Sequence, residues 1–269
     1  MPSWPTRPRT ASARRCATAT NRWGITAGAR RGSEVLRLTA RSVVLSVLLG
    51  AHPAWASVAE LIHLTSDFDI KEATLRVALT RMVGAGDLVR SDDGYRLSER
   101  LLTRQRRQDD AIAPQIRTWN GDWITLAITA VGADARSRAE LRNTLVQNRF
   151  GELREGLWLR PDNLAQPVPA ADRVRVLHSR DDDPAGLASL LWDLQTWSQT
   201  GWRLLAEMHA AADVPARFVA AAGIVRHLVT DPVLPDELVP ADWPGADLRR
   251  AYQDFAAELV ALRDKVEAR

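Results

Sequence analysis

The chain has 269 residues, enough for two or three domains at the usual ~100 to 200 residues per domain. Hydrophobic residues make up 46% of it and include ten tryptophans, yet no window approaches the ~18 consecutive apolar residues of a membrane-spanning helix. The single cysteine, Cys16, excludes an internal disulfide framework and predicts a reducing, cytoplasmic location.

The net charge of +3 and the pI of about 9.6 suggest a nucleic-acid partner, but the positive charge is concentrated at one end. Residues 1–38 carry eight arginines and one glutamate. Residues 39–113 carry ten basic and ten acidic residues, and residues 114–269 carry 18 basic and 22 acidic residues. A DNA-binding function must therefore depend on local patterns of side chains, because the global charge does not support it.

Residues 1–38 are rich in Pro, Thr, Ala, Ser and Arg and show no periodicity, so we expect a disordered tail. The composition fits an accessory extension, a basic arm that contacts DNA, or an organellar targeting segment. The continuous apolar core of a secretory signal is missing.

Three short helices are predicted within the next 45 residues or so, a density typical of a helix-turn-helix. Thr39 is a suitable N-cap for the first, which should end at Gly50. The capping box Ser57-Val-Ala-Glu60 opens the second. The third should span residues 70–83, with Asp69 as its cap, because Asp69-Ile-Lys-Glu72 has the same spacing of acceptor and glutamate.

The third predicted helix has one buried side, because steps of three, four and seven residues align Leu75, Ala78, Leu79 and Met82. Lys71 lies near its positive N-terminus, where a phosphate would bind. Its outer side offers guanidinium, hydroxyl and small apolar groups to the edges of bases, from Arg76, Val77 and Thr80 with Thr74 and Arg81 on one flank. The alternative is the solvated side of an ordinary amphipathic helix.

A short hairpin is predicted to follow Gly86. If Asp92, Asp93 and Gly94 form a three-residue loop with a left-handed glycine, then Arg90 and Arg96 lie opposite one another on the exposed side. These arginines would reach phosphates or the minor groove, unless they serve only solubility. A helix followed at once by a hairpin is typical of a winged helix-turn-helix, so residues 39–98 are expected to bind duplex DNA.

The rest of the chain predicts an α+β, multidomain protein. Residues 99–117 form a connector helix that ends before Pro114. Residues 118–200 contain strands at 123–131, 156–160 and 174–178, a helix at 137–147 and a long helix from Pro184 through Trp197, an order typical of a ferredoxin-like domain. Residues 201–269 form a helical domain, with helices expected at 202–212, 215–228 and 247–268.

Ordered motifs over residues 39–260 resemble those of the PaaX family of bacterial transcriptional regulators, whose founding members repress phenylacetate catabolism. The motifs are Leu75-Arg76-Val77-Ala78-Leu79-Thr80-Arg81-Met82, Trp119-Asn-Gly-Asp-Trp123, Phe150-Gly151-Glu-Leu153, Gly156-Leu-Trp-Leu-Arg160-Pro-Asp-Asn163, His227, Asp231-Pro232, Leu234-Pro235, Leu238, Pro240 and Trp243-Pro-Gly245.

The resemblance implies a winged helix, a central domain similar in fold to the Cas2 endonuclease domain, and a C-terminal helical domain. It also implies a homodimeric, ligand-responsive repressor of a catabolic operon that releases its double-stranded DNA operator when an aryl-CoA thioester binds. Candidates for effector binding are Arg217, Arg226, His227 and Trp243. For His227 the alternative is a C-cap beside a turn at Asp231-Pro232.

A metal-dependent nuclease based on the central domain is the alternative from another class. Asp134 follows the first predicted strand of that domain, but a single loop aspartate is a weak metal site. Asp181-Asp-Asp-Pro184 is equally well explained by capping of a helix. The five histidines have no zinc-ligand spacing. We therefore predict no catalytic residue, no metal and no cofactor.

Overall fold

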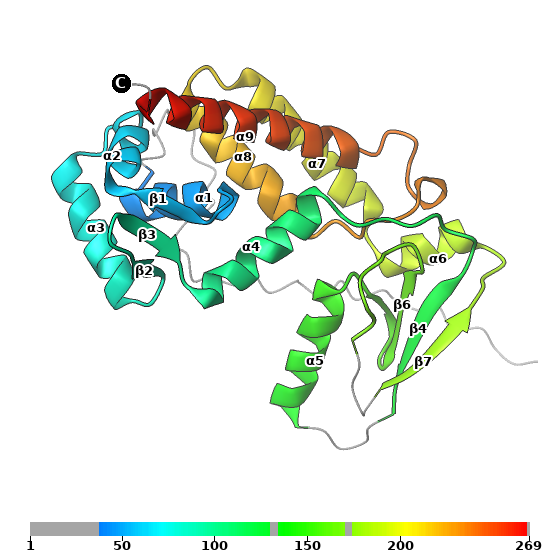
Figure 1. Cartoon of the computed structure of the whole chain (residues 1–269). Helices are drawn as coiled ribbons and strands as arrows, with labels where there is room; N and C mark the ends of the chain where they lie inside the picture. Colours follow the sequence, from blue (N-terminus) through cyan, green and yellow to red (C-terminus); the bar gives the residue numbers. More distant parts are fainter. Residues whose placement is uncertain (1–37, 130–133, 170–173, 268–269) are drawn as a thin grey trace, which may run out of the picture. The chain divides into compact units, whose positions relative to one another are not determined.

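The computed structural model describes residues 38–129, 134–169 and 174–267, and all but the last residue of the tail predicted at residues 1–38 lies outside them (Figure 1). The described residues form a mixed α/β structure with two antiparallel sheets, as an α+β chain requires. None of the described helices is both long and apolar enough to cross a membrane.

The N-terminal elements begin at the predicted caps. Thr39 accepts a hydrogen bond from the Ser42 backbone amide (3.2 Å), and Ser57 and Glu60 form the predicted capping box. A three-stranded sheet in the order β1-β3-β2 completes this part, including a strand, β1, that was not predicted. The elements are α1 (Ala40–Gly50), β1 (Trp55–Ser57), α2 (Val58–Ser66), α3 (Glu72–Gly84), β2 (Leu88–Arg90) and β3 (Gly94–Leu97).

The prediction that Asp69 caps the third helix is wrong. The N-cap of α3 is Lys71, which makes no side-chain cap hydrogen bond. Asp69 instead lies in the turn after α2 with a positive φ of 55°, and its amide donates to the Ser66 carbonyl (3.1 Å). Aspartate tolerates this left-handed conformation better than most residues, so it suits the turn between two helices.

The predicted hairpin register is wrong by one residue. Arg90 pairs with Tyr95 and Val89 with Arg96, and the Ser91 amide donates to the Gly94 carbonyl (2.9 Å). The loop is therefore only Asp92-Asp93, and Gly94 has no positive φ. A shift of one residue moves side chains to the other face of a strand, so Arg90 and Arg96 lie on opposite faces.

The N-terminal helices and sheet enclose one apolar cluster, which also includes Leu101 of the next helix, α4 (Glu99–Ile112). That helix ends before Pro114, as predicted. Its Gln105 side chain is buried and donates to the Leu49 (3.2 Å) and Ala51 (2.8 Å) carbonyls at the end of α1. Hydrogen bonds to the open end of a helix satisfy carbonyls that have no partner within it.

The central domain is a four-stranded sheet in the order β5-β6-β4-β7 with both faces covered. Leu145 of α5 packs with Trp158 on one face, and Leu187 of α6 packs with Trp123 on the other. The strand β5 was not predicted, whereas β4, α5, β6, β7 and α6 follow one another in the predicted order. The elements are β4 (Trp123–Ile128), α5 (Ala135–Gln147), β5 (Gly151–Arg154), β6 (Leu157–Pro161), β7 (Val174–Ser179) and α6 (Pro184–Leu191).

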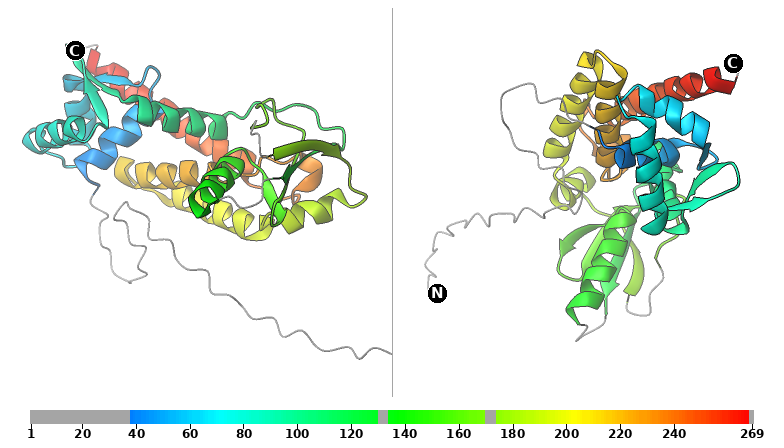
Figure 2. Two further views of the ribbon diagram at one scale, coloured as in Figure 1. Left: turned by 90° about the horizontal axis from the view of Figure 1, so that it is seen from below. Right: turned by 90° about the vertical axis from the view of Figure 1, so that its left-hand side faces the viewer.

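The predicted long helix after Pro184 is interrupted. The chain is extended at Trp192, and Asp193 caps a new helix by accepting from the Thr196 amide (3.0 Å). That helix runs through Gly201, where a break was expected. A Cβ atom at Gly201 would lie 2.7 Å from Pro244, so the glycine permits close packing. The remaining elements are α7 (Leu194–Ala210), α8 (Val214–Leu228), η1 (Asp236–Leu238) and α9 (Gly245–Glu267), of which the three α-helices pack together (Figures 1 and 2).

Candidate nucleic-acid interface

The helix α3 is buried along one side only. Leu75, Leu79 and Met82 are at most 1% exposed, as predicted, while Ala78 is half-buried. The outer residues Lys71, Thr74, Arg76, Val77, Thr80 and Arg81 are all exposed. Val77 is 51% exposed, so an apolar side chain is presented to solvent among cations and hydroxyl groups. Such a mixture suits contact with the floor of the major groove, where thymine methyl groups alternate with acceptors.

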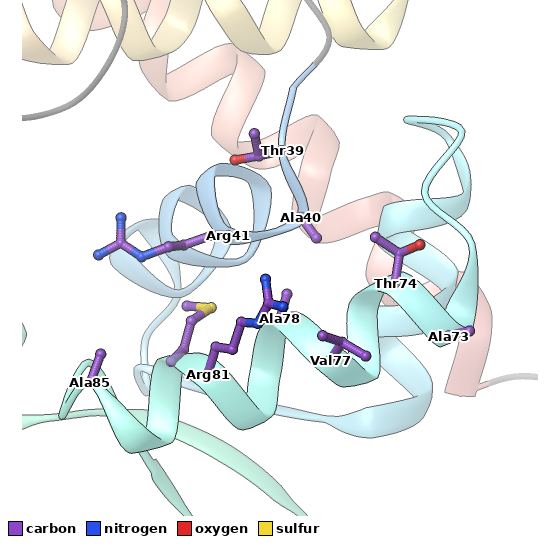
Figure 3. Close-up of a pocket in the computed structure, with 10 residues that line it drawn as sticks. Thr39, Ala40, Arg41, Ala73, Thr74, Val77, Ala78, Arg81 and Ala85 are labelled. Carbon is purple, nitrogen blue, oxygen red and sulfur yellow. The ribbon is translucent and has the colours of Figure 1, made fainter.

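A groove of about 680 Å³ separates α3 from the beginning of α1 (Figure 3). It brings together Thr74, Val77 and Arg81, three of the predicted DNA-contacting residues, with Thr39 and Arg41 at the start of α1. The other predicted residues do not line it. Arg76 and Thr80 lie on the opposite flank of α3, so its exposed surface has two sides with different neighbours.

Arg76 already has a partner within its own helix. Its guanidinium donates through Nε to Glu72 Oε1 (2.8 Å), and the pair is exposed. The Thr80 hydroxyl donates to the Arg76 carbonyl (3.0 Å). An exposed pair at this spacing stabilises a helix by only ~0.3–0.5 kcal/mol, so Arg76 can exchange this partner for a base or a phosphate.

Arg41 is a residue of this surface that the sequence did not indicate. It donates to Asp87 Oδ2 (2.6 Å), whose carboxylate is buried and also accepts from Arg100 on α4. Asp87, which follows α3, thus forms ion pairs with the start of α1 and with the start of α4. Arg41 and Asp87 are 46 residues apart, and no local pattern marks a pair at that separation.

The hairpin presents its two arginines differently. Arg96 shares a face with Trp55 of β1, whose indole donates to the Ser91 hydroxyl (3.0 Å). Arg90 lies on the other face, beside the loop and paired with Tyr95. Both arginines are exposed, but they cannot contact the same phosphate in the way that a directly opposed pair would.

The four residues predicted to bind an effector do not form one site. Trp197 lies between the rings of His227 and Trp243, with centroids 4.2 Å away on each side. His227 Nε2 contacts the Trp197 carbonyl (2.9 Å), and burial lowers the pKa of the imidazole, which favours the neutral ring as donor. Arg217 forms an ion pair with Glu258 (2.6 Å), whereas Arg226 is exposed at a different place on α8.

Asp231, predicted only as a turn residue, is the centre of a buried polar cluster. Its carboxylate pairs with Arg249 (2.7 Å) and accepts from the Val233 amide (2.9 Å). The Asn163 side chain of the central domain donates to the Val233 carbonyl (2.8 Å), and Arg149 donates to the Val229 carbonyl (2.7 Å). These bonds fix the loop after α8 against the central domain.

Two of the carboxylates considered for a nuclease act as helix caps. Asp134 accepts from the Ser137 amide (2.9 Å) and hydroxyl, and these hydrogen bonds lower its pKa. Asp183 accepts from the Gly186 amide (2.9 Å) at the start of α6. Within residues 38–129, 134–169 and 174–267, no group of three or more metal-ligating side chains comes together.

Comparison with known proteins matches three family models in order. A model of the PaaX-like protein matches residues 39–101, the PaaX protein central Cas2-like domain matches residues 116–180, and the PaaX-like protein C-terminal domain matches residues 193–267. The chain is 27% identical over 227 residues to the "Transcriptional repressor PaaX" of Escherichia coli (strain K12), with 71% of each chain covered.

A solved structure, "Uncharacterized protein Rv0674 from Mycobacterium tuberculosis", is 64% identical to this chain. It superimposes with a TM-score of 0.77 and covers 85% of this chain and 99% of its own. With three successive models covering the DNA-binding candidate, the sheet and the C-terminal helices, the chain belongs to the PaaX family.

Proposed function

We propose that this protein is a DNA-binding transcriptional repressor whose winged helix-turn-helix is formed by residues 39–98. One observation carries the proposal: α3 buries one side, exposes the other, and is followed directly by the β2–β3 hairpin. A recognition helix in the major groove with a hairpin beside it has this arrangement. The repressor name of the Escherichia coli relative supports the same function.

In this proposal, the outer side of α3 contacts bases through Arg76, Val77 and Thr80. Thr74 and Arg81 lie on the flank of α3 that faces the start of α1. Lys71, Arg90 and Arg96 contact phosphates. Because Arg90 and Arg96 lie on opposite faces of the hairpin, we assign them to different phosphates. Arg76 exchanges Glu72 for its DNA partner on binding.

The substitution Arg76→Ala tests the assignment of the outer side. A footprint of chromosomal DNA bound by the full chain would supply the operator, and a titration at fixed salt would measure affinity. We expect affinity to fall roughly tenfold or more, and preference at one base pair to relax, because a good contact between arginine and guanine contributes ~1–3 kcal/mol.

Arg136→Ala is the matched control for that titration. Arg136 lies on α5, is exposed, and donates to Glu140 four residues away (2.8 Å), so it reproduces the helical ion pair of Arg76 in the central domain. The control should bind the operator as the wild-type chain does. If Arg76→Ala and Arg136→Ala give the same affinity and base preference, the assignment of the outer side of α3 is wrong.

We further infer that the protein binds a pseudo-palindromic operator as a homodimer. Each chain is divided into domains at 39–98, 118–200 and 201–269, with a connector at 99–117. The resemblance supports control of a catabolic operon by a small effector of the aryl-CoA class. An effector weakens DNA binding only if it favours a dimer geometry in which the recognition helices no longer match the half-site spacing. The proposal assigns no catalytic residue. The promoter found by the footprint would identify the pathway.

A further inference from the structure

A cavity of about 310 Å³ lies between the N-terminal helices and the C-terminal helices. α1 and α4 contribute to one side of it, and α8 and α9 contribute to the other. Pockets that bind small molecules begin at about this size and occur preferentially between packed helices or domains. The cavity therefore has the volume for one aromatic ring system or a short branched chain.

The lining is mainly apolar. Val47 of α1 and Val225 of α8 contribute aliphatic surface, and Phe218 and Phe255 contribute two rings that meet edge to face, with centroids 6.3 Å apart. An apolar body placed here would lose its contact with water, which favours binding in proportion to the area buried.

The same cavity contains one buried side-chain oxygen that lacks a hydrogen-bond partner among the described residues. The Gln108 side-chain oxygen is buried and accepts no hydrogen bond from any residue that the structure describes. A buried acceptor without a partner is costly, so a ligand that brings a donor would gain stability there. Burial, together with the nearby Asp109 carboxylate, raises the pKa of the Tyr252 hydroxyl, so it stays a neutral donor.

Two guanidinium groups give the cavity a positive side. Arg104 of α4 and Arg226 of α8 both line it, and burial followed by the charge of Arg226 lowers the pKa of Arg104. The Arg226 guanidinium has neither an acceptor nor an ion-pair partner within the part of the chain that the structure describes. An anion between them would remove the repulsion and form charge-assisted hydrogen bonds.

We propose that this cavity binds a small organic anion, with its aromatic or branched aliphatic body against Phe218 and Phe255 and its anionic group at Arg104 and Arg226. The binding site does not depend on the proposed DNA-binding function, whereas its role in regulation rests on that function. The ligand would touch helices of both the DNA-binding part and the C-terminal domain. Of the four residues that the sequence suggested for an effector, Arg226 alone lines this cavity.

Two fluorescent dyes with the same rings test the site in the full chain without DNA. The dye 8-anilinonaphthalene-1-sulfonate carries an anionic group, and N-phenyl-1-naphthylamine lacks it. We expect one sulfonate dye per chain, bound more tightly than the neutral dye. Arg226→Gln should weaken the sulfonate roughly tenfold and leave the neutral dye unchanged, because only the anion uses the guanidinium.

Ala222→Phe, which fills the cavity from α8, should abolish binding of both dyes, and Ala256→Leu from α9 should do the same if the first variant unfolds. Arg107→Gln, an exposed arginine of α4 outside the cavity, is the matched control and should change neither dye. The site is overturned if Arg226→Gln and a folded cavity-filling variant both bind the dyes as the wild-type chain does. Displacement of the sulfonate dye by benzoate or by benzoyl-CoA then distinguishes a carboxylate from a phosphate-bearing thioester.

The operator titration separates the two proposals. If the variants change dye binding but the bound dye does not change operator affinity, the binding site is retained and its regulatory role is overturned. Loss of operator binding in Arg76→Ala would support the DNA-binding function whatever the dyes do. The two proposals can therefore fail independently.

Discussion

At the scale of single residues, buried charges depend on partners far along the chain. Asp231 is 1% exposed and Arg249 is partly buried beside it. Arg249 also donates to the Ala111 carbonyl at the end of α4 (3.1 Å). One ion pair thus joins the loop after α8, the connector helix and α9. Removing one member of such a pair leaves the other charge without compensation.

We expect Asp231→Ala to lower the free energy of unfolding by roughly 3–5 kcal/mol, since Arg249 would remain buried without its carboxylate. Urea unfolding followed by circular dichroism measures this. Asp247→Ala is the control, because Asp247 pairs with Arg250 on the exposed side of the same helix (3.4 Å) and should contribute at most ~1 kcal/mol. Equal effects of the two substitutions would contradict the role of burial.

At the scale of secondary-structure elements, the hairpin depends on a strand that precedes it by more than 30 residues. Gly94 pairs with Ser57 of β1, and a Cβ atom at Gly94 would lie 2.2 Å from the Ala56 carbonyl oxygen. The glycine is thus required by the approach of β1 and not by a left-handed loop. The register that places Arg90 and Arg96 follows from the same contact.

The substitution Gly94→Ala should destabilise the protein by roughly 1–3 kcal/mol, because the added methyl group forces β1 and β3 apart. Gly84→Ala provides the contrast. Gly84 ends α3 with open space around it, so alanine there should be neutral or stabilising by up to ~1 kcal/mol. Thermal unfolding of the two variants measures both effects, and a stable Gly94→Ala variant would refute the tight pairing.

At the scale of the whole molecule, basic charge and the candidate DNA-binding surface occupy different parts of the chain. Residues 1–38 hold eight arginines, whereas residues 39–113 are neutral overall. Specific contacts are therefore assigned to a few side chains of α3 and the hairpin. Any contribution from the tail would be nonspecific, because phosphate contacts carry no direct sequence information.

Deletion of residues 1–37 removes eight arginines and one glutamate. We expect unchanged thermal unfolding and unchanged base preference, but weaker binding to nonspecific DNA at low salt and a shallower dependence of log affinity on log salt. Titrations at several salt concentrations measure the slope. A change in base preference on deletion would instead show that a basic arm reads sequence.

The sequence by itself determined most helices and the two sides of α3. Thr39 and the Ser57–Glu60 capping box act within three residues of their partners, and Leu75, Leu79 and Met82 follow the helical period. Such features were predictable because their causes lie within one or two turns of the chain.

Only the tertiary structure decided the hairpin register, the break at Trp192, the Arg41–Asp87 pair and the cavity at Arg104 and Arg226. The Asp193 cap lies in an apolar pattern that fits one continuous helix, so local periodicity favoured the wrong alternative. Arg104 and Arg226 line the same cavity because α4 packs on α8, although 122 positions separate them in the sequence. Contacts at that distance depend on how elements pack, and the packing is set by the whole apolar core.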